Sequence, residues 1–80
     1  MDKELRIKKQ EISKEETEEE IKALKKTQKE IRELLDRTNT QTIAYLELKS
    51  FLKRLEEQIE INNDILAEIN EGIAYLEKFL

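Results

Sequence analysis

The sequence predicts an all-α protein, a helical hairpin or three-helix bundle with coiled-coil-like packing that assembles into oligomers. Three observations support this fold class. The 80 residues contain no Pro and a single Gly, so almost nothing interrupts a helix. Charged residues make up 42% of the chain, a composition typical of long, solvated helices. From Leu24 onward, apolar residues recur at alternating spacings of three and four, which is the period of a helical stripe.

The chain is short enough for one domain only. With 38% hydrophobic residues, a lone chain of this length encloses little interior, and we expect another chain to share its core. We divide the sequence into a charged N-terminal arm over residues 1–12 and a single helical domain over residues 13–80.

The first helix is predicted over residues 13–37. Ser13 and Glu16 have the spacing of a capping box, in which each side chain bonds to the backbone amide of the other residue. The acidic residues that follow Ser13 would then lie at the positive end of the helix dipole. Residues 1–12 are therefore expected to form a frayed arm or a short separate helix.

The chain reversal is predicted near residues 38–41, because no apolar residue lies between Leu35 and Ile43. Asn39 is a candidate for a left-handed residue after the first helix. Thr38 or Thr40 is a candidate cap for the second helix, predicted over residues 41–80. Thr38 and Gln41 also have capping-box spacing.

The segment 62–64, Asn-Asn-Asp, is the second place where the chain could turn. The alternative is a continuous helix in which Asn62 lies inside the apolar stripe. In that case Thr38, Gln41 and Asn62 are the polar residues that set register, because a buried polar group needs a partner across the seam.

A heptad frame that starts at Leu24 places apolar residues at eight of nine first positions and five of eight fourth positions, including Leu34. Phe51, Ile65 and Phe79 widen the stripe beyond the need of a two-stranded coil, which is typical of bundles of three or four helices. The predicted core and interface residues are Tyr45, Leu48, Phe51, Leu52, Leu55, Ile59, Ile65, Leu66, Ile69, Ile73, Leu76, Phe79 and Leu80. Ile43, Leu46 and Ile61 fall outside the seam and indicate further neighbours.

Composition also limits the chemistry. Without Cys or His, the chain offers no disulfide, no thiolate nucleophile, no zinc site of the usual ligands and no imidazole for proton transfer. The many carboxylates lie on the outward face of the frame, so we expect a non-enzymatic protein with no catalytic residue, metal or cofactor. No apolar run resembles a signal peptide or approaches the ~20 residues of a membrane span, so a soluble cytoplasmic protein is expected.

The predicted function is a helical assembly or protein–protein interaction module that acts through the apolar stripe in residues 45–80. The expected partner is a second copy, as a dimer or higher oligomer, or another helical protein. The alternative is a small regulatory adaptor, of viral, plasmid or host origin, that binds nucleic acid or phosphate through the face from Lys22 to Arg32. Acidic residues interleave with that face and the net charge is −4, so nucleic acid is the less favoured partner. Designed bundles share this composition, and the sequence does not separate natural from designed origin.

Overall fold

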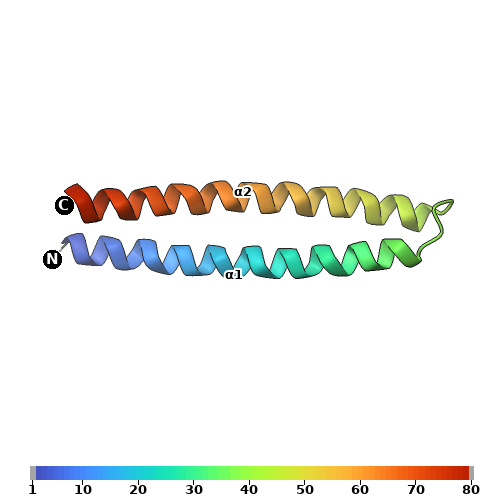
Figure 1. Cartoon of the computed structure of the whole chain (residues 1–80), viewed down its shortest axis with the longest axis horizontal. Coiled ribbons are helices and arrows are strands. Elements are labelled where there is room, and N and C mark those ends of the chain that lie inside the picture. Colours follow the sequence, from blue (N-terminus) through green and yellow to red (C-terminus); the bar gives the residue numbers. More distant parts are fainter. Residues whose placement is uncertain (1, 80) are drawn as a thin grey trace.

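The computed structural model describes residues 2–79, which form two long antiparallel helices (Figure 1). Helix α1 spans Asp2–Arg37 and helix α2 spans Ile43–Phe79. The Cα trace measures 60 × 14 × 13 Å, and both ends of the chain lie at the same end of this rod (Figure 1). Of the two predicted arrangements, the helical hairpin is confirmed.

Helix α1 begins eleven residues earlier than the sequence predicts, so the assignment of residues 1–12 to a separate arm is wrong from Asp2 onward. Asp2 and Glu4 provide the acidic first turn, and Ile7 is half-buried. Packing against α2 thereby stabilises a segment that would fray in an isolated helix.

The predicted capping box does not form. Ser13 and Glu16 are exposed residues in the interior of α1. The Ser13 carbonyl accepts a hydrogen bond from Thr17 Oγ1 at 2.7 Å, so Ser13 does not mark a helix start.

The reversal lies where the sequence places it, in residues 38–42, but its caps differ from the prediction. The Thr38 hydroxyl donates to the Leu34 carbonyl at 2.7 Å and so remains attached to the end of α1. The Gln41 amide donates to Asn39 Oδ1 at 2.9 Å, which is an Asx turn rather than a capping box. No residue among 2–79 has a positive φ, so Asn39 is not a left-handed terminator.

Thr42, rather than Thr38 or Thr40, caps helix α2. Its Oγ1 accepts a hydrogen bond from the Tyr45 amide at 3.3 Å and donates one to the Asn39 carbonyl at 2.7 Å. This geometry is that of an N-cap side chain bonded to the third helical residue. Helix α2 therefore begins at Ile43.

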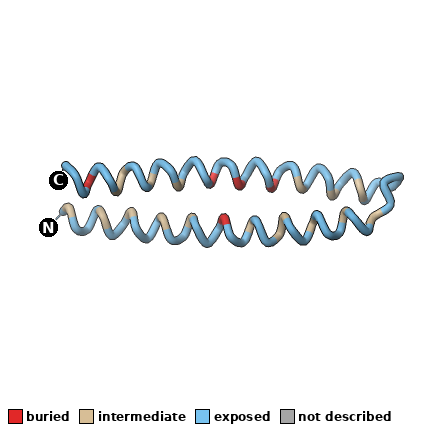
Figure 2. Tube along the Cα trace, viewed as in Figure 1, coloured by how far each residue is buried: buried red, intermediate tan, exposed pale blue. Residues whose placement is uncertain are grey.

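Helix α2 runs without a break through residues 62–64, so of the two alternatives for this segment the continuous helix is confirmed and the turn is wrong. The inward-facing residues of α2 follow the predicted heptad frame. They are buried or half-buried, and they are Tyr45, Leu48, Leu52, Leu55, Ile59, Asn62, Leu66, Ile69, Ile73 and Leu76. Gly72, one residue before Ile73, is also half-buried. Leu55, Ile59 and Asn62 are buried in the middle part of α2, whereas Leu76 is buried near its C-terminal end; Ile21 is the buried residue of α1 (Figure 2).

Helix α1 presents a more polar seam to α2. Its buried or half-buried residues are Lys3, Ile7, Gln10, Lys14, Thr17, Ile21, Leu24, Thr27, Gln28, Ile31 and Leu35, and half-buried Thr38 follows directly after the helix. The hydroxyls of Thr17 and Thr27 donate to carbonyls one turn earlier in α1, so they need no partner across the seam. The frame places Leu34 in the seam, but Leu34 is 47% exposed and Leu35 is the inward residue, because the seam of α1 follows the row that runs through Ile7 and Ile21.

Asn62 is more deeply buried than the buried apolar residues of the core, at 4% exposure. Its Oδ1 accepts a hydrogen bond from Gln58 Nε2 at 3.3 Å, while Nδ2 is buried without a hydrogen-bond partner. A buried amide without its partner costs about 1–3 kcal/mol. The unpaired Asn62 amide therefore destabilises the hairpin at the position where the residue between the helices is most deeply buried.

Replacing Asn62 by Leu is expected to raise the free energy of unfolding by about 1–3 kcal/mol, because it removes the unpaired amide and adds an apolar contact. Urea denaturation followed by circular dichroism at fixed protein concentration measures the change. The matched control is Asn63→Leu at the next residue, which is exposed and should shift stability by no more than about 0.5 kcal/mol. A loss of stability in Asn62→Leu would contradict this account of the core.

Candidate functional site

The two sides of the helix pair differ sharply in polarity. On one side, Arg32 of α1 and Glu56 of α2 form an ion pair, with Nη2 and Oε1 3.3 Å apart. The other α2 residues at multiples of seven from Glu56 share this side of the helix, and all are polar and exposed: Lys49, Asn63, Asn70 and Glu77. We call this side the polar flank.

The opposite side of α2 is apolar, and we call it the apolar flank. Its members are Phe51, Ile61, Ile65, Tyr75 and Phe79, which recur at spacings that place them on one side of the helix. They remain 40%, 51%, 41%, 58% and 61% exposed, respectively. The hairpin therefore leaves a row of large apolar side chains without a neighbouring helix.

The apolar flank has local order along its length. The rings of Tyr75 and Phe79 lie 5.0 Å apart with an interplanar angle of 39°, an arrangement typical of packed aromatic pairs. The Arg54 guanidinium lies over the Phe51 ring, 5.8 Å from its centroid. Gln58 and Gly72 complete the row between these groups.

Gly72 is not required by the hairpin. A Cβ built there would meet only the side chain of Gln10, at 3.8 Å, which is ordinary van der Waals contact. Its φ is also within the usual helical range rather than positive. The only glycine of the chain thus lies on the apolar flank without a reason inside the hairpin.

Helix α1 borders the apolar flank with mostly polar residues. Leu34 follows Arg32 by two residues, so it lies on the other side of α1 from the ion pair. Counting back from Leu34 in sevens gives Thr27, Glu20, Ser13 and Arg6. Within this series only Leu34, near the connection, is apolar. Helix α1 also exposes Leu5 and Ile12, at 55% and 56%, outside the series.

The predicted core and interface residues divide into two groups. Most face α1, whereas Phe51, Ile65 and Phe79 lie exposed on the apolar flank. Leu80 lies outside the described residues. Ile61 and Tyr75 were not predicted as members of this row, although their spacing to Ile65 and Phe79 was the signal that could have identified them.

Of the three predicted register-setting residues, only Asn62 takes a buried position between the helices. Thr38 is half-buried but bonds locally to the Leu34 carbonyl. Gln41 is exposed in the connection, so its placement in the seam is wrong. Ile43 and Leu46, predicted to lie outside the seam, are 74% and 63% exposed at the start of α2.

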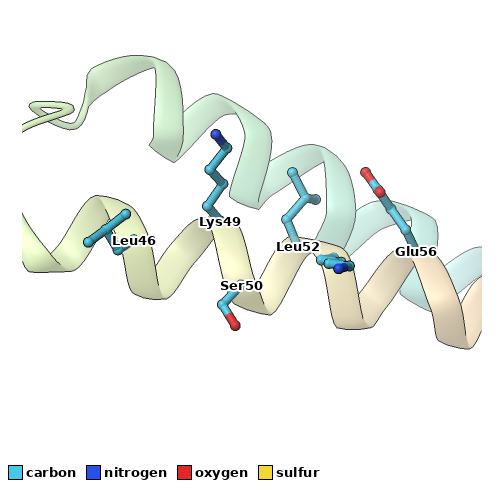
Figure 3. A pocket seen from close by; sticks show the side chains of 6 residues that line it. Leu46, Lys49, Ser50, Leu52 and Glu56 are labelled. Atoms are coloured by element: carbon cyan, nitrogen blue, oxygen red, sulfur yellow. The ribbon is translucent and has the colours of Figure 1, made fainter.

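The basic face from Lys22 to Arg32 is exposed on α1. Lys25 and Lys29 precede Arg32 by seven and three residues, so they lie beside the polar flank. Lys49 and Lys53 of α2 add to the same side, around a shallow open hollow (Figure 3). In this view Lys49, Leu52 and Glu56 project toward α1, whereas Ser50 points away from it.

No cluster of three or more residues capable of holding a metal ion occurs within residues 2–79. Neither described helix is long and apolar enough to cross a bilayer. No protein family, no curated protein and no solved structure matches the chain. The apolar flank is the most distinctive surface of the described hairpin.

The Arg32–Glu56 ion pair should contribute little to stability, because its side chains are 58% and 46% exposed. Glu56→Gln is expected to lower the free energy of unfolding by at most about 1 kcal/mol, and high salt should reduce the difference. Urea titrations at low and high salt measure it. The control is Glu57→Gln, at the exposed residue next to the ion pair. A loss of several kcal/mol in the free energy of unfolding that is specific to Glu56→Gln would contradict this prediction.

Proposed function

We propose that the protein is a non-enzymatic helical assembly or interaction module that binds another helix through α2. The single observation that carries this proposal is the apolar flank, with five large apolar side chains between 40% and 61% exposed. A row of large apolar side chains left exposed along one side of a helix is a candidate surface for binding a partner. A partner helix can cover such a row with residues at three- and four-residue spacing.

The hairpin narrows the surface that can perform this function. Most of the apolar stripe in residues 45–80 is directed at α1, so those side chains stabilise the hairpin rather than meet a partner. The side chains left for recognition are those of the apolar flank. Phe51, Tyr75 and Phe79 are aromatic, and aromatic residues are enriched at protein interfaces.

Ile65→Lys is expected to abolish association, because it places a charge in the middle of the apolar flank while leaving the seam with α1 unchanged. Asp64→Lys adds the same side chain one residue earlier, at an exposed position that points elsewhere, and should retain association. Sedimentation velocity of each purified chain measures self-association. Affinity purification from extract identifies proteins that the wild type and Asp64→Lys retain but Ile65→Lys loses. The proposal fails if neither assay separates Ile65→Lys from the other two chains.

A second candidate function is binding of nucleic acid or phosphate at the polar flank. It is favoured by the addition of Lys49 and Lys53 from α2 to the side on which Lys25, Lys29 and Arg32 lie. Cationic side chains from two helices could meet successive phosphates. The ion pair of Arg32 with Glu56 opposes this function, because it partly neutralises the face.

Gel-shift titration with RNA and DNA tests the second candidate. If it is correct, Lys25→Glu combined with Lys29→Glu abolishes a complex whose affinity falls steeply as salt increases. The charge-matched control is Lys8→Glu combined with Lys9→Glu, on exposed residues near the start of α1, which should bind as the wild type does. Absence of any salt-dependent complex would exclude this function.

A further inference from the structure

We infer that the apolar flank of α2 binds the same flank of a second copy of this chain, with the two α2 helices antiparallel and a two-fold axis at Ile65. The resulting assembly is a closed four-helix dimer. This inference rests on the proposed function and names its partner. Five observations on the hairpin support it.

The first observation is the surface that the hairpin exposes. A compact monomer of this mass would expose about 5,100 Å², whereas the hairpin exposes 6508 Å². The surplus, roughly 1,400 Å², exceeds the ~800 Å² that each partner buries in an interface of standard size. The hairpin therefore exposes enough additional surface to form an interface of standard size with a second copy.

The second observation is the area of the apolar flank itself. Its five partly exposed side chains offer roughly 500 Å² of apolar surface per copy, or about 1,000 Å² for two copies. Stable interfaces bury about 1,200–2,000 Å² in total, of which somewhat more than half is apolar. Two apolar flanks therefore supply the apolar part of a standard interface without help from another protein.

The third observation is that Phe51 and Phe79 of the apolar flank lie at equal sequence distances on either side of Ile65. In a two-fold contact, if one residue meets a second residue of the partner, the second meets the partner's copy of the first. With the axis at Ile65, Phe51 meets Phe79 of the second copy and Ile65 meets Ile65. Gln58, the longest polar side chain of the row, then lies opposite Gly72, which has none.

The fourth observation is charge, which selects the antiparallel direction. An antiparallel pair places Arg54 beside Tyr75 of the second copy, a cation–π contact, and Glu68 beside Ile61 and Gln58. A parallel pair would stack Arg54 on Arg54 and Glu68 on Glu68, which brings like charges together at an interface. It would also place Gly72 against Gly72 of the second copy, so that neither copy provides a side chain at this level.

The fifth observation is Gly72. Glycine weakens the interior of a helix relative to alanine, and the hairpin gains nothing from it because a Cβ would fit beside Gln10. A second helix that approaches closely at this level explains the residue. The side chain of Gln58 from the second copy would occupy the space.

Cysteine cross-linking of purified chains tests the geometry, because the chain has no cysteine of its own. A mixture of Gln58→Cys and Gly72→Cys chains should form a mixed disulfide, whereas each chain alone should form little of one. Ile65→Cys alone should form a symmetric disulfide. Ser50→Cys, on an exposed position that points away from α1, is the control and should not cross-link.

Sedimentation equilibrium from low micromolar to near-millimolar concentration tests the stoichiometry, and the wild type should be a dimer. Ile65→Lys should raise the dissociation constant about 100-fold or more, because the residue occurs twice at the axis, and Asp64→Lys should not.

A disulfide from Gln58→Cys alone would overturn the antiparallel arrangement, and a trimer or tetramer would overturn the closed dimer. A wild type that remains monomeric overturns this inference but leaves the proposed function standing if a protein from extract still depends on Ile65. If the wild type is monomeric and no protein from extract depends on Ile65, the proposed function is overturned as well.

Discussion

The structure depends on one constraint: a pair of helices has a single line of contact, and α2 carries more apolar side chains than that line can cover. Residues close to the line are buried, as Leu55, Ile59 and Leu76 are at 8% exposure. Residues on the next row of the same helix, such as Ile65 and Phe79, are 41% and 61% exposed. Since burial of apolar surface is the main favourable contribution to folding, the uncovered row is both a cost to the isolated hairpin and a reason for it to associate.

The two helices have different roles in meeting this constraint. Polar side chains of α1 fill part of the seam. The Thr hydroxyls bond to their own helix, and Lys residues such as Lys14 can pack their apolar stems while the ammonium stays in water. The exposed large apolar side chains of α1 are Leu5, Ile12 and Leu34, which are fewer than those of α2. Helix α2 presents apolar side chains to α1 and on its outer flank, so any recognition is concentrated on α2.

Much of the fold could be predicted from the sequence, because the heptad period in α2 is regular and the gap in apolar residues between Leu35 and Ile43 marks the reversal. The helix start could not, because Ser13 and Glu16 match a capping box whether or not the preceding residues are helical, and packing of Ile7 decided between the two. The row containing Leu34 and that containing Leu35 are both plausible seams in the sequence, and only the partner helix selects one. Ile61 and Tyr75 were missed as members of the apolar flank because a frame centred on the seam treats each as an isolated outward residue.

The distribution of polar residues also limits how far assembly through α2 can proceed. On α2 the polar flank carries Lys49, Glu56, Asn63, Asn70 and Glu77 at every seventh residue, so it lacks an apolar row for a third hairpin. On α1 the residues that border the apolar flank include Arg6, Ser13 and Glu20, which form a polar rim. In the dimer that we propose, the two apolar flanks cover each other, so no apolar row of comparable length is left exposed on α2. We propose closure at two copies because a self-complementary two-fold contact uses the same surface on both chains and the charged residues of the polar flank oppose further addition.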